Sequence, residues 1–153
     1  MSIQPEQLTV REACRDDIVD LAPLFDQYRQ FYGYDGDLTK AERFLRARFE
    51  AQDSLLLLAR KGPTAVGFVQ CYAGYSSLEC RPSWLLSDLF VVAEARRQGV
   101  ARALLQATRQ AATRQSCCLV ELFTARANLG ARRLYEAQGY VEDKEFLHYE
   151  LML

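Results

Sequence analysis

The stretch Leu89-Phe90-Val91-Val92-Ala93-Glu94-Ala95-Arg96-Arg97-Gln98-Gly99-Val100-Ala101-Arg102 decides the fold. An apolar run, a short polar loop and an amphipathic segment follow one another, which predicts a strand, a loop and the start of a helix. The arginines of this stretch crowd the start of the predicted helix. Unpaired N–H groups make that end positive, so each cation is disfavoured there by about 0.3–1 kcal/mol. A bound polyanion would reverse this energy, because amides and guanidinium groups would converge on it.

A second interpretation of the arginines stays open on local physics alone. Arg96, Arg97 and Arg102 are equally consistent with a solvated surface cluster, because most arginines lie at the surface. The sequence contains neither the GxxxxGK[ST] motif of a phosphate loop nor the GxGxxG motif of a dinucleotide fold. An anion site of another kind and a solvated cluster therefore remain as alternatives.

The segments on either side alternate between the periodicity of a strand and that of a helix. Glycines and prolines divide these segments, and no repeat or low-complexity tract interrupts them. Strands are predicted at 8–13, 54–59, 65–75, 84–92, 118–124, 141 and 146–153, and helices at 15–32, 41–49, 99–114 and 128–138. A mixed α/β sheet with helices on both faces would bury all of these apolar stripes in a single domain over residues 1–153.

The composition excludes several classes of protein. Half of the 153 residues are apolar and 25% are charged, which is ordinary for a globular domain. The net charge of -1 argues against a general nucleic-acid binder, since phosphate contacts need a basic surface. No apolar run approaches the length of about 20 residues that spans a bilayer. Residues 1–6 lack the basic and apolar regions of a signal peptide, so we expect a cytoplasmic protein.

The cysteines do not suggest a disulfide framework or a metal site. Their number is five, which is odd, and Cys117 is adjacent to Cys118. The chain has no CxxC pair, and its single histidine, His148, lies far along the sequence from every cysteine. We therefore expect no bound metal and treat the thiols as small apolar residues.

The segment Arg96-x-x-Gly99-x-Ala101 resembles the acetyl-CoA signature [RQ]-x-x-G-x-[GA] of the GNAT superfamily of N-acetyltransferases. The order of elements is similar along essentially the whole chain, which implies a mostly antiparallel sheet of about six to seven strands with about four helices. Arg97 stands where glycine is frequent, and Ala101 is the less common permitted choice. The resemblance implies that the coenzyme is bound by Leu89, Phe90 and Val91 along its pantetheine arm and by Arg96, Arg97, Gln98, Gly99, Val100, Ala101 and Arg102 at its pyrophosphate.

A second motif lies on the last predicted helix. Asn128 is a favourable N-cap and Gly139 a favourable residue just beyond the helix end. Taken alone, Tyr135 is more simply a core aromatic with its hydroxyl at the edge. The segment nevertheless resembles the N-x(6)-Y-x(3)-G-[FY] element of the same superfamily, here ending at Tyr140. That resemblance implies that Tyr135 lies beside the coenzyme sulfur and that Asn128 contacts the pantetheine arm or the loop carrying it.

The chemistry of acetyl transfer suits a phenol at this position. A neutral amine attacks the thioester, a tetrahedral oxyanion forms, and its collapse expels a thiolate. An unperturbed phenol, with a pKa of about 10, stays protonated near neutrality and can protonate a thiolate whose thiol pKa is about 8.5. Tyr135 is the predicted acid, and a backbone N–H near Phe90 or Val91 is the predicted oxyanion donor. The base stays unassigned among Asp88, which should face away unless a bulge re-aims it, Glu121 and ordered water.

The resemblance places acceptor specificity in the first two helices and the loop between them. Tyr28, Tyr32 and Asp35 could hold an ammonium group by cation–π attraction and charge pairing. Equally, the tyrosines could be core residues, and Asp35 with Asp37 could stop and cap helices. Three function classes follow: an acetyltransferase of a small amine such as a polyamine or amino acid, an acetyltransferase of protein lysines or N-termini, and a non-catalytic acyl-CoA-binding module. The closing strands often build dimers in relatives, so a homodimer is expected.

Overall fold

The computed structural model of the chain describes residues 7–153 and divides them into two units. The first unit ends at Phe123, and the second comprises Thr124–Leu153. The expectation that no signal peptide is present concerns residues 1–6, which lie outside the described residues. No helix within residues 7–153 has the length and apolar character needed to cross a membrane.

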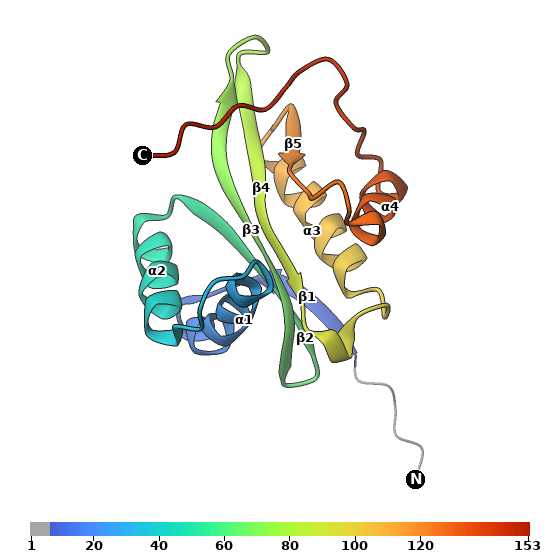
Figure 1. Cartoon of the computed structure of the whole chain (residues 1–153). Coiled ribbons are helices and arrows are strands. Elements are labelled where there is room, and N and C mark those ends of the chain that lie inside the picture. The colour runs from blue at the N-terminus through green and yellow to red at the C-terminus, as the bar shows by residue number, and fades with distance from the viewer. Residues whose placement is uncertain (1–6) are drawn as a thin grey trace. The chain divides into compact units, whose positions relative to one another are not determined.

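The first unit contains a five-stranded sheet whose strands follow one another in chain order (Figure 1). The strands are β1 (Leu8–Glu12), β2 (Ser54–Lys61), β3 (Thr64–Ser76), β4 (Arg81–Val91) and β5 (Leu119–Leu122). The first four pair antiparallel with their neighbours, whereas β5 runs parallel to β4. The expected mixed, mostly antiparallel sheet is confirmed, with slightly fewer strands than the expected six to seven.

Helices cover both faces of this sheet (Figure 1). They are α1 (Ile18–Phe31), α2 (Leu38–Ala51) and α3 (Val100–Arg114), with short 3-10 turns at Arg15–Asp17 and Ala93–Ala95. The helices α1 and α2 pack on a core face that includes Leu56, Leu58, Phe68 and Phe90. The helix α3 contacts β2, β3 and β4 on the opposite face.

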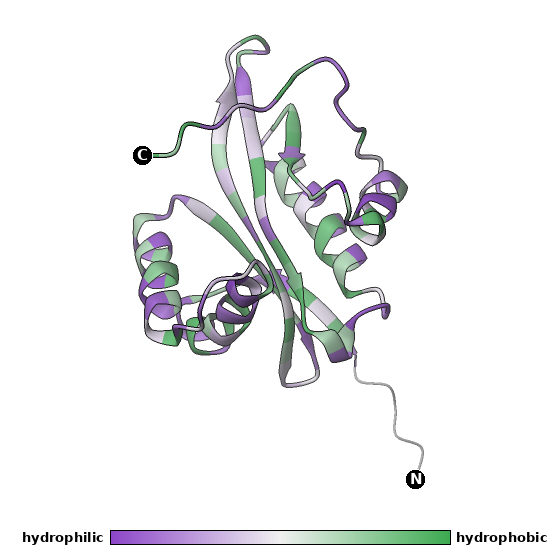
Figure 2. Ribbon diagram, viewed as in Figure 1, coloured by the Kyte–Doolittle hydropathy of each residue, from purple (hydrophilic) through white to green (hydrophobic). Residues whose placement is uncertain are grey.

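The apolar run on β2 shows why its strand conformation was predictable. Leu56, Leu57 and Leu58 are all buried although their side chains alternate between the two faces. A strand covered on both faces reads as a continuous apolar run, because neither set of side chains meets water. Polar segments interrupt the apolar ones along the longer strands β3 and β4 (Figure 2).

The second unit holds α4 (Leu129–Ala137) followed by residues without strand structure. The strands predicted at 141 and 146–153 are therefore wrong. Val141, Phe146 and Tyr149 are exposed, as are the other large apolar residues near the chain end. Alternating apolar residues favour an extended chain, but a strand also needs an adjacent strand whose backbone N–H and C=O groups can form hydrogen bonds with it. Within Thr124–Leu153 the only helix or strand is α4, which offers no such edge.

Element boundaries move by a few residues for local reasons. The helix α2 begins at Leu38, before the predicted residue 41, because the Asp37 side chain accepts a hydrogen bond from Lys40 N at 2.9 Å and caps the helix. The strand β5 is shorter than predicted, because only its four residues pair with β4. Gly62, at φ 52, allows the tight turn predicted between β2 and β3.

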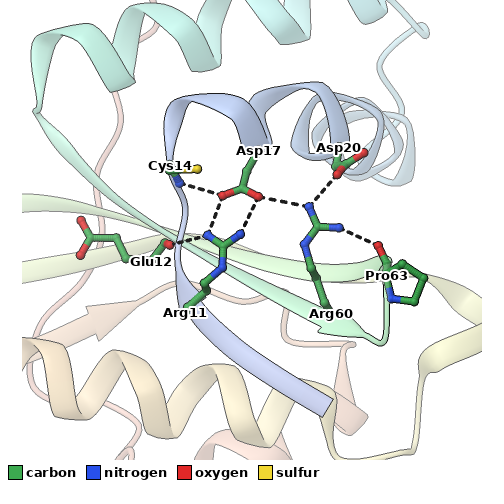
Figure 3. A network of polar contacts seen from close by, with 7 residues as sticks. All are labelled: Arg11, Glu12, Cys14, Asp17, Asp20, Arg60 and Pro63. Atoms are coloured by element: carbon green, nitrogen blue, oxygen red, sulfur yellow. Dashed lines mark hydrogen bonds and ion pairs between the residues drawn. The ribbon is translucent and has the colours of Figure 1, made fainter. Parts of the chain in front are cut away.

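A buried carboxylate joins β1, α1 and β2 at their ends (Figure 3). Asp17 is only 4% exposed and accepts two hydrogen bonds from Arg11, at 2.6 and 2.8 Å. The backbone N–H of Cys14 donates to the same carboxylate at 2.8 Å, and Arg60 donates at 3.1 Å. Arg60 also contacts Asp20 at 2.6 Å. The hydrogen bonds from Arg11 hold the pKa of Asp17 well below its ordinary value, although burial opposes them.

We predict that Asp17→Asn lowers the free energy of unfolding at pH 7 by about 1.5–3 kcal/mol, because charged hydrogen bonds to both arginines are lost. A depressed folded-state pKa stabilises the fold above the ordinary aspartate pKa, and this contribution is lost as pH falls. The difference in Tm between the two proteins should therefore be constant from about pH 7 to 5 and shrink below about pH 4. Asp16→Asn, which changes an exposed neighbour, is the control. Equal Tm shifts for both variants would contradict the prediction.

Candidate active site

The strand β4 presents an edge with no strand neighbour in the first unit over its last residues. Its pairing with β5 covers only Ser83–Leu86. Val92 N donates to Val66 O at 3.0 Å on the β3 side, and backbone groups alternate in direction along a strand. Leu89 and Val91 therefore direct their backbone groups to the open edge, whereas Phe90 directs its own toward β3. Of the two predicted oxyanion donors, only the Val91 N–H lies on that edge.

A β-bulge at Ser87 changes which face the following residues occupy. Leu86 pairs with Cys71, but Asp88 pairs with Gln70, so Ser87 is an extra residue without a partner on β3. The extra residue turns Asp88 and Phe90 toward the face covered by α1 and α2. The sequence pattern alone had Asp88 facing away, and the bulge reverses that orientation.

The carboxyl group of Asp88 is buried against polar side chains. It is 7% exposed, and this burial raises its pKa above the ordinary value, while hydrogen bonds from Tyr28 and Ser87 partly oppose the shift. The Ser87 hydroxyl lies 3.2 Å from Asp88 Oδ1, and the Tyr28 hydroxyl lies 3.4 Å from Ser87 O. The neighbouring Gln70 is fully buried, and its Oε1 has no hydrogen-bond partner among residues 7–153.

The loop between β4 and α3 has two residues in the left-handed backbone region. Gly99 has φ 83 and Arg97 has φ 60. Glycine adopts this conformation without strain, whereas a side chain there costs of order 1 kcal/mol. The first intrahelical bond joins Ala103 N to Gly99 O at 3.0 Å, which leaves the preceding amides of α3 unpaired by the helix. The first turn of α3 contains no acidic residue, so the positive end of the helix lacks a protein anion.

The side chains of this loop divide into two groups. Arg96 donates from Nε to Val91 O at 3.0 Å, and Gln98 donates to Glu94 O at 2.7 Å and is also hydrogen-bonded by Lys61. Arg97 and Arg102 form no ion pair with a carboxylate among the described residues. All predicted coenzyme-binding residues except Asn128 therefore lie on β4, this loop or the start of α3, in one unit: Leu89, Phe90, Val91, Arg96, Arg97, Gln98, Gly99, Val100, Ala101 and Arg102.

The predicted acceptor residues lie in different surroundings, some packed against the core and others exposed. The ring of Tyr28 packs against Phe68 at 5.9 Å and against Phe90 at 6.4 Å, so its body belongs to the core while its hydroxyl reaches Asp88. Tyr32 is exposed and touches the Tyr28 ring edge-on at 5.1 Å. Asp35 is exposed and forms no ion pair within the described chain, whereas Asp37 is the cap of α2.

In the second unit, the predicted boundaries of α4 are confirmed. Asn128 accepts a hydrogen bond from Ala131 N at 3.2 Å as the N-cap, and Gly139 follows the helix with φ 87. Tyr135 is half-buried and packs edge-on against Tyr140 at 5.9 Å. Tyr140 N donates to Tyr135 O at 3.0 Å, which fixes the chain just beyond the helix.

Two features of the candidate site were not predicted from the sequence. Gln70 is an isolated polar residue inside the apolar run from Val66 to Cys71, and that isolation was a readable signal. Arg96 also lies over the rings of Phe31 and Phe90, and this contact had no signal because it joins segments far apart in sequence. Glu121, the other candidate base, is exposed on β5.

All five cysteines are free, and residues 7–153 contain no group of three or more His, Cys, Asp and Glu side chains that could hold a metal.

Comparison with known proteins now defines the family. The sequence profile of the acetyltransferase (GNAT) family matches residues 21–140. The Bacillus subtilis (strain 168) protein YhfO, described as an uncharacterized N-acetyltransferase, is 41% identical over 142 residues, covering 93% of this chain and 95% of that protein. A crystal structure of a probable acetyltransferase has a TM-score of 0.89 at 35% identity and covers 95% of this chain and 97% of that one.

A more distant structure shares the fold alone. The ribosomal-protein-alanine N-acetyltransferase from Brucella melitensis biovar Abortus 2308 has a TM-score of 0.79 at 20% identity, with coverage of 96% of this chain and 100% of that one. The family profile spans both the β4–α3 loop and the Tyr135 helix. The chain therefore belongs to the acetyltransferase (GNAT) family and is an acyltransferase.

Proposed function

We propose that this protein transfers the acetyl group of acetyl-CoA to a primary amine of a small molecule, such as a polyamine or an amino acid. The observation that carries the proposal is the loop before α3, where unpaired amides and uncompensated arginines adjoin the open edge of β4. The two units would form one acetyltransferase domain, because the family profile spans both. A cytoplasmic location and a homodimer belong to the same proposal.

The residues of the loop suit the pyrophosphate of a coenzyme. Gly99 has φ 83, and a Cβ atom added there would meet nothing within 4 Å, so the backbone is open to a ligand. The helix start supplies N–H groups, and Arg97 and Arg102 supply charge. Leu89 and Val91 can pair with the amide groups of a pantetheine arm as a neighbouring strand would. When bound, acetyl-CoA would supply the activated acetyl thioester.

Asp88 is the base that we propose for the acceptor. A carboxylate whose pKa is raised above its ordinary value is a stronger base, so it removes a proton from an ammonium group more effectively. The bulge turns it toward α1, whose Tyr28 belongs to the proposed acceptor site. Gln70 pairs with Asp88 across β3 and β4, and Gln70 Oε1 lacks a hydrogen-bond donor among the described residues, which an amine N–H would supply. Tyr32 and Asp35 would contact the remainder of the acceptor.

The proposed residues transfer protons in the following order during acetyl transfer. Asp88 accepts a proton from the ammonium group, and the neutral amine attacks the acetyl carbonyl. The Val91 N–H, on the open edge of β4, stabilises the oxyanion that develops. The C–S bond breaks as the tetrahedral adduct collapses, and Tyr135 donates its phenolic proton to the departing thiolate. The amine nitrogen releases its second proton to solvent water, and the Tyr135 phenolate recovers a proton from the same solvent. No acyl-enzyme forms, so the thiols of the protein take no part.

The experiment that tests the proposal is a screen of small amines with acetyl-CoA, in which released thiol is measured. Polyamines and amino acids should give turnover, while lysine-containing peptides should not. Turnover restricted to peptides would favour an acetyltransferase of protein lysines or N-termini. Coenzyme binding without turnover on any amine would favour an acyl-CoA-binding module.

The coenzyme site is tested by Gly99→Asp. The substitution puts a negative charge beside the proposed phosphates at a position with φ 83, which also strains the backbone. Calorimetry should show acetyl-CoA affinity at least tenfold lower, about 1.4 kcal/mol. Gly130→Asp changes a glycine of α4 that also has open space around its Cβ and serves as the control. Unchanged affinity in a folded Gly99→Asp protein would exclude the anion site.

The acid is tested by Tyr135→Phe, which keeps the aromatic ring and removes only the hydroxyl. Coenzyme affinity and Tm should hold, while kcat should fall by about 10²–10⁴, the usual contribution of general acid catalysis. Tyr140→Phe, at the ring that packs against Tyr135, controls for effects on packing. A kcat within about threefold of the original would show that another group protonates the thiolate.

The base is tested by Asp88→Asn. We expect kcat to fall by about 10²–10⁴. Burial raises the pKa of Asp88 in the folded protein above its value in the unfolded chain. The protonated carboxyl therefore stabilises the fold at low pH, and this contribution is lost as pH rises from the unfolded-state pKa to the folded-state pKa. At neutral pH the buried charge then lowers the free energy of unfolding. The Tm of Asp88→Asn at pH 7–8 should therefore equal or exceed that of the original protein. Glu121→Gln, at an exposed carboxylate on β5, should leave both quantities unchanged. Full activity of Asp88→Asn would assign the base to water.

A further inference from the structure

The side chain of Arg96 connects three segments that are distant in sequence. Its guanidinium carbon lies 5.9 Å from the ring centre of Phe31, the last residue of α1, and 5.8 Å from that of Phe90 on β4. Its Nε donates to Val91 O at 3.0 Å on the open edge of β4. The backbone of Arg96 belongs to the loop that we propose for the coenzyme pyrophosphate. One cation thus joins that loop to the end of α1.

The polar ends of the guanidinium group remain available. Neither Nη atom of Arg96 forms a hydrogen bond or an ion pair within residues 7–153, and the residue is exposed. Both flanking rings attract a cation through their faces and leave the in-plane N–H groups free. An anion bound by these N–H groups would be held by a side chain that already contacts Phe31 and Phe90.

The contact continues toward the acceptor residues through a chain of aromatic rings. Phe31 touches Tyr32 edge-on at 5.2 Å, and Tyr32 touches Tyr28 at 5.1 Å. Tyr28 in turn hydrogen-bonds to Asp88. Phe31 is 59% exposed, so few core contacts hold its ring, and Arg96 supplies one of them. The Arg96 guanidinium is therefore one of the few groups that hold the Phe31 ring, together with Tyr32.

We propose that Arg96 is a positioning residue that couples coenzyme binding to the order of the acceptor segment, residues 31–37. Occupation of the phosphate site fixes the guanidinium group, which fixes Phe31 and thereby the loop after α1. The coenzyme and the amine then bind with positive coupling, because the first ligand orders residues that the second requires. This inference rests on the proposed function and deepens it.

Backbone hydrogen exchange tests the coupling without an amine. The amides of Gly33, Tyr34 and Asp37 bond to Gln30 O at 2.9 Å, Arg29 O at 3.1 Å and Asp26 Oδ1 at 2.8 Å, so they report on the order of the segment. Saturating coenzyme A should slow exchange at least fivefold both in residues 31–37 and in the loop 96–102. Phe31→Leu removes the ring from an exposed position and should keep the protection of the loop while losing that of the segment.

Two further variants separate positioning from general effects. Phe31→Tyr keeps an aromatic face and should restore protection of residues 31–37. Arg97→Gln removes an arginine of the same loop that contacts no ring among the described residues, and at saturating coenzyme A it should retain protection of both regions. Arg96→Gln, also saturated with coenzyme A, should lose the protection of residues 31–37 and keep that of the loop 96–102.

The outcomes distinguish this inference from the proposed function. Protection of the loop without protection of residues 31–37 in the original protein would overturn the coupling and leave the coenzyme site standing. Equal protection of the segment in Phe31→Leu would likewise overturn it. Absence of protection in both regions would overturn the coenzyme site together with the coupling.

Discussion

The candidate site depends on a mismatch between the two edges of β4, which pair with their neighbouring strands over different lengths. Toward β3 the pairing runs along the whole strand with one extra residue at Ser87, and toward β5 it stops at Leu86. The bulge and the end of pairing thus fall at the same point in the chain. One consequence is a carboxyl group, Asp88, turned into the α1 face. The other is an edge at Leu89 and Val91 that β5 does not cover. Val91 O accepts a hydrogen bond from Arg96 Nε there, and the remaining N–H and C=O groups of this edge need another partner.

Such a site is costly for the fold, and the rest of the first unit offsets that cost. Asp88 is buried with a raised pKa, Gln70 keeps a buried acceptor unpaired, and Arg97 has a left-handed backbone. Each feature removes of order 1 kcal/mol or more of stability. The network around Asp17 lies elsewhere, at the ends of β1, α1 and β2, and its carboxylate is satisfied by four donors. Stabilisation and strain are therefore carried by different parts of the same sheet.

The sequence allowed the fold to be predicted where local patterns and tertiary packing agree. The turn at Gly62 and the caps at Asn128 and Gly139 form as expected, because each depends on neighbours within a few residues. The apolar run on β2 also forms as expected, because helices cover both faces of the sheet there. The strands expected near the C-terminus do not form, because alternation specifies an extended chain but not a partner. The orientation of Asp88 was unpredictable for a related reason: a bulge depends on how two strands align, and one strand's sequence does not contain that alignment.

Tyr28 belongs both to the core and to the proposed acceptor site. Tyr28 fills the α1 face with its ring, in contact with Phe68 and Phe90, and its hydroxyl reaches the carboxyl of Asp88. Because its ring is held on several sides, the hydroxyl would need little further ordering on binding of the proposed acceptor, which is the condition for preorganised catalysis. Asp88 is buried, and desolvation is the largest cause of its raised pKa. In the proposed site, Tyr28 would therefore link packing to reactivity, because the residue that fills the α1 face also hydrogen-bonds to Asp88 and acts on its pKa.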